Sequence, residues 1–127
     1  MDVRDVDSDR QRATVDQLVS AYRAAAEAEG TDVSVKVIAD TSPVVLPAIV
    51  KDHLVAAAAE HGLAYRLLSS GASHDAQQVN RVTPTGMIFV PSVDGLSHVP
   101  EEHTEASDLA SGVDVLLAAL YRLDVDA

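Results

Sequence analysis

The sequence has no cysteine and no tryptophan, and it has few aromatic residues of any kind. Its 127 residues include three tyrosines and one phenylalanine. Without cysteine the chain cannot form a disulfide scaffold, a thiolate zinc finger or a cysteine nucleophile. No apolar run approaches the ~20 residues of a membrane span, and the acidic N-terminus does not resemble a signal peptide. Because 47% of the residues are hydrophobic, we expect a soluble, globular, cytoplasmic protein.

Basic residues, and lysine above all, are also scarce. Nine Lys and Arg stand against 20 Asp and Glu, which gives a formal net charge of −11. This balance argues against nucleic acid and anionic membranes as partners, because both need a basic surface. Only Lys36 and Lys51 are lysines. A carboxylate-rich surface with few lysines suits high salt, where self-repulsion is screened, and favours a halophilic protein. The alternative is an ordinary acidic protein from a GC-rich genome.

Hydrophobic spacing and helix-boundary residues predict four helices. The first starts at Ser8, the predicted cap, and stops at Gly30, a natural left-handed C-terminal residue. The second runs from Pro47 to about His61, and a short helix covers residues 75–81. The last helix covers residues 107–123. Apolar residues fall on one face of the first helix (Val15, Leu18, Val19, Tyr22 and Ala26) and of the last (Leu109, Val113, Leu116, Leu117 and Leu120).

Four segments between these helices have the pattern of β-strands. Residues 2–5 and 64–68 are short, and residues 33–38 alternate valine with other side chains. Residues 87–90 form a continuous apolar run, which is typical of a strand buried on both faces of a parallel sheet. The alternation of helix and strand predicts an α/β fold with its site at the carboxyl ends of the strands.

Two polar loops follow predicted strands, at residues 70–76 and 94–102. Gly71 and Gly95 would let the backbone approach a ligand closely. His98, flanked by carboxylates, is a candidate metal ligand, although a solvated surface histidine is the alternative. The pair Glu101 and Glu102 could act as acid and base, or form only an acidic loop.

Three motifs together resemble one family of enzymes. They are Ser-Gly-Ala-Ser-His-Asp-Ala at 70–76, Pro-Thr-Gly-Met-Ile-Phe-Val-Pro-Ser at 84–92 and Gly-Leu-Ser-His-Val-Pro-Glu-Glu at 95–102. The family is that of the N-carbamoyl-L-amino-acid hydrolases, allantoate amidohydrolases and β-ureidopropionases, within the dimetal aminoacylases and peptidases. The resemblance implies the remnant of a three-layer α/β metallohydrolase catalytic domain at residues 43–127. Part of an α+β dimerisation (lid) domain would precede it at residues 1–42.

The resemblance also implies roles for individual residues. His98 matches a metal ligand, and His74 matches a catalytic histidine that contacts substrate and stabilises the developing oxyanion. Gly71, Asp75 and Gly95 match residues of the substrate-binding loops. The implied reaction is hydrolysis of a linear amide or ureido C–N bond, as in N-carbamoyl-L-amino acids, ureidopropionate or allantoate. The implied cofactor is zinc or manganese, two ions per site, with a glutamate as general base.

The chain departs from that family in its length and its missing ligands. Family members are about three times as long, and none of the five histidines here stands in a His-x-Asp pair. A catalytic zinc needs three protein ligands, so we expect this C-terminal portion alone to be inactive and not to retain its metals. Expected partners are a small carbamoyl or ureido substrate, and either a second copy or a chain carrying the missing N-terminal part. The alternatives are an inactive, self-associating fragment and one half of a split enzyme.

Overall fold

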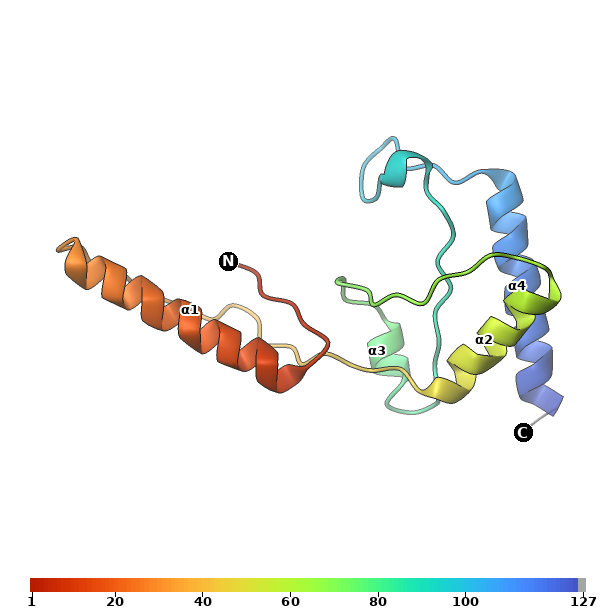
Figure 1. Ribbon diagram of the computed structural model, residues 1–127, viewed down its shortest axis with the longest axis horizontal. Helices are drawn as coiled ribbons and strands as arrows, with labels where there is room; N and C mark the ends of the chain where they lie inside the picture. Colours follow the sequence, from red (N-terminus) through yellow and green to blue (C-terminus); the bar gives the residue numbers. More distant parts are fainter. Residues whose placement is uncertain (126–127) are drawn as a thin grey trace. The chain divides into compact units, whose positions relative to one another are not determined.

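The computed structural model describes residues 1–125, and all of its regular secondary structure is helical (Figure 1). Four α-helices and one short 3₁₀ helix follow one another along the chain. They are α1 (Ser8–Ala28), α2 (Ala48–Glu60), α3 (Ala76–Val79), η1 (Val93–Gly95) and α4 (Ala106–Val125). The helices predicted at these four places are confirmed, whereas η1 lies in a stretch that was predicted as a loop.

The predicted α/β fold is wrong for the described residues, which contain no β-strand. The segments 2–5, 33–38, 64–68 and 87–90 lie outside all regular structure. None of the backbone hydrogen bonds found among residues 1–125 joins two of these segments. A strand exists only when a neighbouring strand accepts and donates its hydrogen bonds, and local residue type cannot supply that neighbour. The three-layer catalytic remnant and the α+β dimerisation remnant are therefore both corrected to helices joined by irregular segments.

The described chain divides into two compact units. One comprises Met1–Val45 with Ser69–Ala72, and the other comprises Leu46–Leu68 with the described residues from Ser73 onward. The first unit contains α1, and the second contains the remaining helices. The domain boundary that the sequence places after residue 42 stays a prediction about the whole protein. None of the helices within residues 1–125 has the length and apolar character that crossing a bilayer requires.

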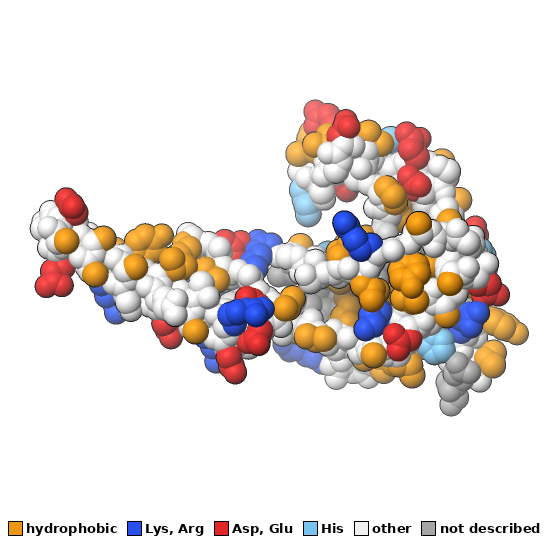
Figure 2. Space-filling view, viewed as in Figure 1, with side chains coloured by type: hydrophobic (Ala, Val, Ile, Leu, Met, Phe, Trp, Pro, Cys, Tyr) orange, Lys and Arg blue, Asp and Glu red, His pale blue; other side chains and the backbone are white. Residues whose placement is uncertain are grey.

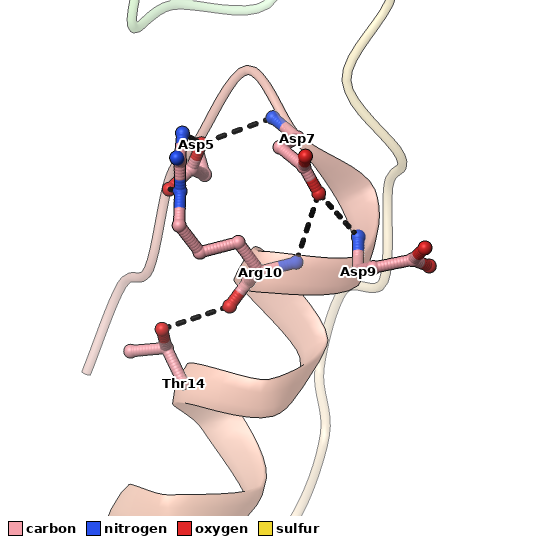
Figure 3. A network of polar contacts seen from close by, with 5 residues as sticks. All are labelled: Asp5, Asp7, Asp9, Arg10 and Thr14. Carbon is pink, nitrogen blue, oxygen red and sulfur yellow. Dashed lines mark hydrogen bonds and ion pairs between the residues drawn. The ribbon is translucent and has the colours of Figure 1, made fainter.

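Helix α1 is defined at both ends by local hydrogen bonds, and Figure 3 shows those at its start. The Asp7 carboxylate accepts from the backbone N–H groups of Asp9 and Arg10, each at 2.9 Å, so the cap is Asp7 rather than the predicted Ser8. Asp7 has the extended backbone that a cap requires, with φ −116° and ψ 117°. At the other end Gly30 has φ +63°, and the Thr31 N–H donates to the Ala26 carbonyl at 2.9 Å. This is a Schellman end, as the glycine predicts.

An ion pair supports the start of α1. The Arg10 guanidinium donates from Nε to Asp5 Oδ2 at 2.6 Å, and the Asp5 carboxylate also accepts the Asp7 N–H at 3.0 Å. The Arg10 guanidinium, with the Asp7 N–H second, holds the pKa of Asp5 well below its ordinary value. No residue of α1 is buried, although its predicted apolar face is the less exposed one. Its ends, rather than its packing, therefore fix this helix.

Helices α2 and α4 pack against each other and form the core of the second unit. Their contact is lined by small residues: Ala57 is fully buried, and Ala58, Val115 and Ala119 are buried beside it. Short side chains allow two helix backbones to approach closely. At the last turn of α2, Glu60 Oε2 accepts from Arg122 of α4 at 2.6 Å. That guanidinium lowers the pKa of Glu60.

Two glycines let irregular segments pack against these helices. A Cβ on Gly112 of α4 would lie 2.6 Å from Val90 Cγ1, and one on Gly86 would lie 2.6 Å from Val50 Cγ1. Both distances are too short for carbon atoms in contact. The absence of a side chain at Gly86 and Gly112 therefore lets residues 86–90 lie against α2 and α4.

The leucine-rich face of α4 is exposed. The buried face of the helix carries Val115 and Ala119, while Leu117 is 67% exposed. The other members of the predicted apolar face are exposed in the same way (Leu109, Val113, Leu116 and Leu120). Helix α4 is therefore apolar on two sides, and α2 covers the side with the smaller residues.

Candidate functional site

The first candidate loop, residues 70–76, is shared between the two units. Gly71 belongs to the first unit, where its carbonyl accepts a hydrogen bond from the Arg4 guanidinium. Arg4 also donates to Asp2 Oδ2, from Nε at 2.9 Å and from its second terminal nitrogen at 2.6 Å. These bonds lower the pKa of Asp2 and raise the pKa of Arg4. A guanidinium has five N–H donors, so Arg4 is a cation in contact with a predicted substrate-binding residue.

His74 and Asp75 belong to the second unit and lie at the start of α3. The carbonyl of His74 accepts the Gln77 N–H at 3.0 Å, and the carbonyl of Asp75 accepts those of Gln78 and Val79 at 2.8 and 3.0 Å. The Asp75 side chain makes no capping hydrogen bond. Asp75 therefore shapes the loop through its backbone.

The His74 ring contacts an aromatic side chain from the segment that was predicted as a strand. Its centroid lies 5.7 Å from that of Phe89, with the two planes 65° apart. This is an edge-to-face arrangement, which is favourable between aromatic rings. His74 is half-buried, so Phe89 limits the directions in which the imidazole can point.

The second candidate loop contains Gly95 and His98. Gly95 has φ +68°, His98 has φ +60°, and both are exposed. The His98 N–H donates to Glu102 Oε2 at 2.7 Å. At the base of the loop the Val93 N–H donates to the His103 carbonyl at 2.8 Å. The loop is therefore closed on itself, with His98 near its tip.

The described residues do not by themselves make a metal centre. Within residues 1–125 no group of three or more His, Asp and Glu side chains could hold a metal ion. The His98 imidazole could supply one nitrogen ligand, whereas a catalytic zinc takes three ligands from protein. The described part of the chain thus offers one ligand but not a complete site.

The surroundings of this loop are acidic. Glu101, Glu102 and Glu105 lie in or beside it, and His103 Nε2 is 3.9 Å from Glu105 Oε1. Figure 2 shows acidic side chains interspersed with hydrophobic ones on the visible surface of each unit. Carboxylates near His98 would favour a bound cation.

Two contacts in these loops were missed in the sequence. Arg4 touches Gly71 from 67 residues away, and only tertiary structure brings such residues together. Glu102 binds the backbone of His98. The spacing of four residues between His98 and Glu102 was a usable signal, but the sequence-based prediction concerned only the adjacent pair Glu101 and Glu102, as acid and base or as an acidic loop.

Comparison with known proteins identifies the family. Residues 4–122 match the model of peptidase family M20/M25/M40, and the chain belongs to this family. It is 36% identical to the N-carbamoyl-L-amino-acid amidohydrolase of Paenarthrobacter aurescens, over 98% of this chain and 30% of that protein. It is also 36% identical to the allantoate amidohydrolase of Escherichia coli, over 97% of this chain and 30% of that protein.

A solved structure agrees with this assignment. The chain is similar to the crystal structure of AtUAH in complex with (S)-hydroxyglycine, with a TM-score of 0.78 and 30% identity. The match covers 95% of this chain and 29% of that one. The chain therefore spans about 30% of the length of these relatives. The resemblance to amidohydrolases of this family is confirmed.

Proposed function

We propose that these residues form the C-terminal portion of a metal-dependent amidohydrolase that cleaves linear amide or ureido C–N bonds. The observation that carries the proposal is the match over nearly the whole chain to relatives that act on allantoate and N-carbamoyl-L-amino acids. The substrate would be an N-carbamoyl-L-amino acid, a ureidopropionate or allantoate, and the compartment the cytoplasm. His98 would be this chain's ligand to zinc or manganese.

His74 would bind the carbonyl under attack. Its ring packs edge-to-face with that of Phe89, which restricts the imidazole and would let it donate to a developing oxyanion with little rearrangement. Gly71, Asp75 and Gly95 would shape the walls around the substrate.

The remaining ligands and the general base would come from polypeptide equivalent to the rest of the family chain. The exposed leucine face of α4 supports this idea. Leu117 is 67% exposed and is one of five large apolar residues on that face. A contiguous apolar surface of this kind is typical of an interface. The second candidate function is a self-associating protein without activity, which the apolar face of α1 would serve, because no residue of that helix is buried.

Activity measurements test the proposal. The 127-residue chain with added zinc, manganese or cobalt should not hydrolyse N-carbamoyl-L-amino acids or allantoate. Activity should appear when the chain is combined with the E. coli allantoate amidohydrolase truncated before the matching region. His98→Ala should abolish that activity, whereas His103→Ala in the same loop should retain it. Equal activity in both variants would contradict the role of His98.

A further inference from the structure

We infer that Glu102 is a positioning residue, which holds the backbone of His98 in the conformation that presents its imidazole at the tip of the loop. The inference rests on the proposed function in one respect, namely that His98 is a metal ligand. The conformational part rests on contacts within the second unit alone.

The backbone of His98 needs such a partner. Its φ of +60° lies in the left-handed region, which costs a residue with a Cβ roughly 1–2 kcal/mol. Among residues with a Cβ, asparagine, aspartate and histidine adopt this region more often than others, but it is still populated by only a few per cent of non-glycine residues. Some interaction must therefore compensate for the strained backbone of His98.

Glu102 supplies that interaction. Its Oε2 accepts the His98 N–H at 2.7 Å, a distance typical of a charge-assisted hydrogen bond. The Glu102 N–H in turn donates to the Val99 carbonyl at 3.0 Å. The two bonds form a tight turn from His98 to Glu102, so that the carboxylate folds back over the turn and fixes its first residue.

The base of the loop is held separately by Ser92. Its hydroxyl lies 2.5 Å from the Leu96 carbonyl oxygen and 3.3 Å from that of His103. These contacts, together with the hydrogen bond of 2.8 Å from the Val93 N–H to the His103 carbonyl, close the base of the loop. Ser92 therefore fixes the two ends of the loop relative to each other, and Glu102 fixes the backbone conformation of His98 at its tip.

This arrangement gives Glu102 a different role from acid–base catalysis. A carboxylate that is bound to a backbone N–H four residues away acts on the metal ligand and not on the reacting bond. Glu101, next to it, makes no hydrogen bond within the described residues. The two neighbouring carboxylates thus provide a matched pair of test and control positions.

Nuclear magnetic resonance of the isotope-labelled 127-residue chain tests the inference. In the native chain His98 should show the strong intraresidue amide–Hα contact of a left-handed residue and slowed exchange of its amide proton. Glu102→Ala should remove the strong contact and speed this exchange about tenfold, as loss of a charged hydrogen bond requires. Glu102→Gln, which keeps an acceptor oxygen, should restore most of both signals, and Glu101→Ala should leave them unchanged.

A second variant separates the loop from the fold. In Glu102→Ala combined with His98→Gly, the backbone chemical shifts of the neighbouring Ser97 and Val99 should return toward their native values, because glycine adopts positive φ without a Cβ. Retention of the native His98 signals in Glu102→Ala, or equal losses in Glu101→Ala, would overturn the inference. If instead Glu102 orients His98 as expected but His98→Ala leaves the reconstituted hydrolase active, only the proposed function fails.

Discussion

Helices α1 and α4 are almost equal in length, with 21 and 20 residues, but they are stabilised in different ways. Helix α1 has a side-chain cap, an ion pair at its start and a Schellman end, and buries no residue. Helix α4 buries Val115 and Ala119 against α2. Local hydrogen bonds define the first helix, and tertiary packing defines the second. Changes to caps should therefore affect the first unit, and changes to buried residues the second.

The largest effect is expected from a charge placed between α2 and α4. Ala57 is fully buried, so Ala57→Asp would bury a carboxylate without a partner and should cost about 3 kcal/mol or more of the free energy of unfolding. Ala59→Asp adds the same charge to an exposed position of the same helix. Urea denaturation of both variants, followed by circular dichroism, measures the difference. Equal stability of the two variants would show that this helix pair is not the core.

The contrast between the helices also explains what the sequence could predict. Gly30 ends α1 through its own backbone, apolar periodicity predicted α1 and α4, and Pro47 and Gly62 predicted the limits of α2. The sequence could not predict which face of α4 is buried, because Val115 and Leu117 are both apolar. Only the tertiary contact with Ala57 and Ala58 determines that Val115 is the buried one. The strand-like segments failed for the same reason, since pairing depends on partners that residues 1–125 do not supply.

The candidate site likewise contains features that local sequence signals predict and features that depend on tertiary structure. His74 and His98 were predicted from local motifs. The contact of His98 with Glu102 is local, whereas the His74 ring contacts Phe89 in another segment. The contact of Arg4 with Gly71 spans 67 positions, and no local pattern reports it. The complete set of metal ligands could not be obtained from these residues at all.

The next prediction concerns self-association and compares the apolar face of α1 with that of α4. We expect the chain, whose mass is 13.4 kDa, to form a dimer through the apolar face of α1, where Tyr22 is half-exposed. Tyr22→Glu should weaken the dimer at least about tenfold, because a buried charge there costs more than 1.4 kcal/mol. Leu117→Glu on α4 serves as the matched variant and should leave the dimer intact. Light scattering over a concentration series measures both, and a concentration-independent monomer would contradict the prediction.

Removing the cap of α1 should have a smaller effect. Asp7→Ala leaves the N–H groups of Asp9 and Arg10 without their acceptor and should cost about 1 kcal/mol. Asp7→Asn keeps an acceptor oxygen and should recover most of this loss. Amide exchange within residues 8–14 measures the change, and α4 should be unaffected. A loss spread evenly over both helices would mean that the two units do not unfold separately.

Salt should stabilise the chain by a few degrees. The net charge of −11 opposes compaction, and the screening length falls from about 10 Å at 0.1 M salt to about 3 Å at 1 M. Melting temperatures in a series of KCl concentrations should therefore rise. A constant or falling melting temperature would remove the argument for adaptation to high salt and leave an ordinary acidic protein.

The smallest effect is expected from the exposed ion pair that joins α2 and α4. Arg122 lowers the pKa of Glu60, so the pair stabilises the folded chain above the ordinary glutamate pKa of about 4.3. This contribution is lost as the pH falls through the lowered pKa, because the carboxyl group is then protonated in both states. Arg122→Gln should therefore lower the melting temperature slightly at pH 7 and leave it unchanged near pH 3. Asp5 and Arg10 form the equivalent pair on α1, and the effect of Arg10→Gln should persist to a lower pH, because the pKa of Asp5 is held well below its ordinary value. A deficit of Arg122→Gln that persists at pH 3 would show that the Arg122 side chain acts through packing between the helices rather than through its charge.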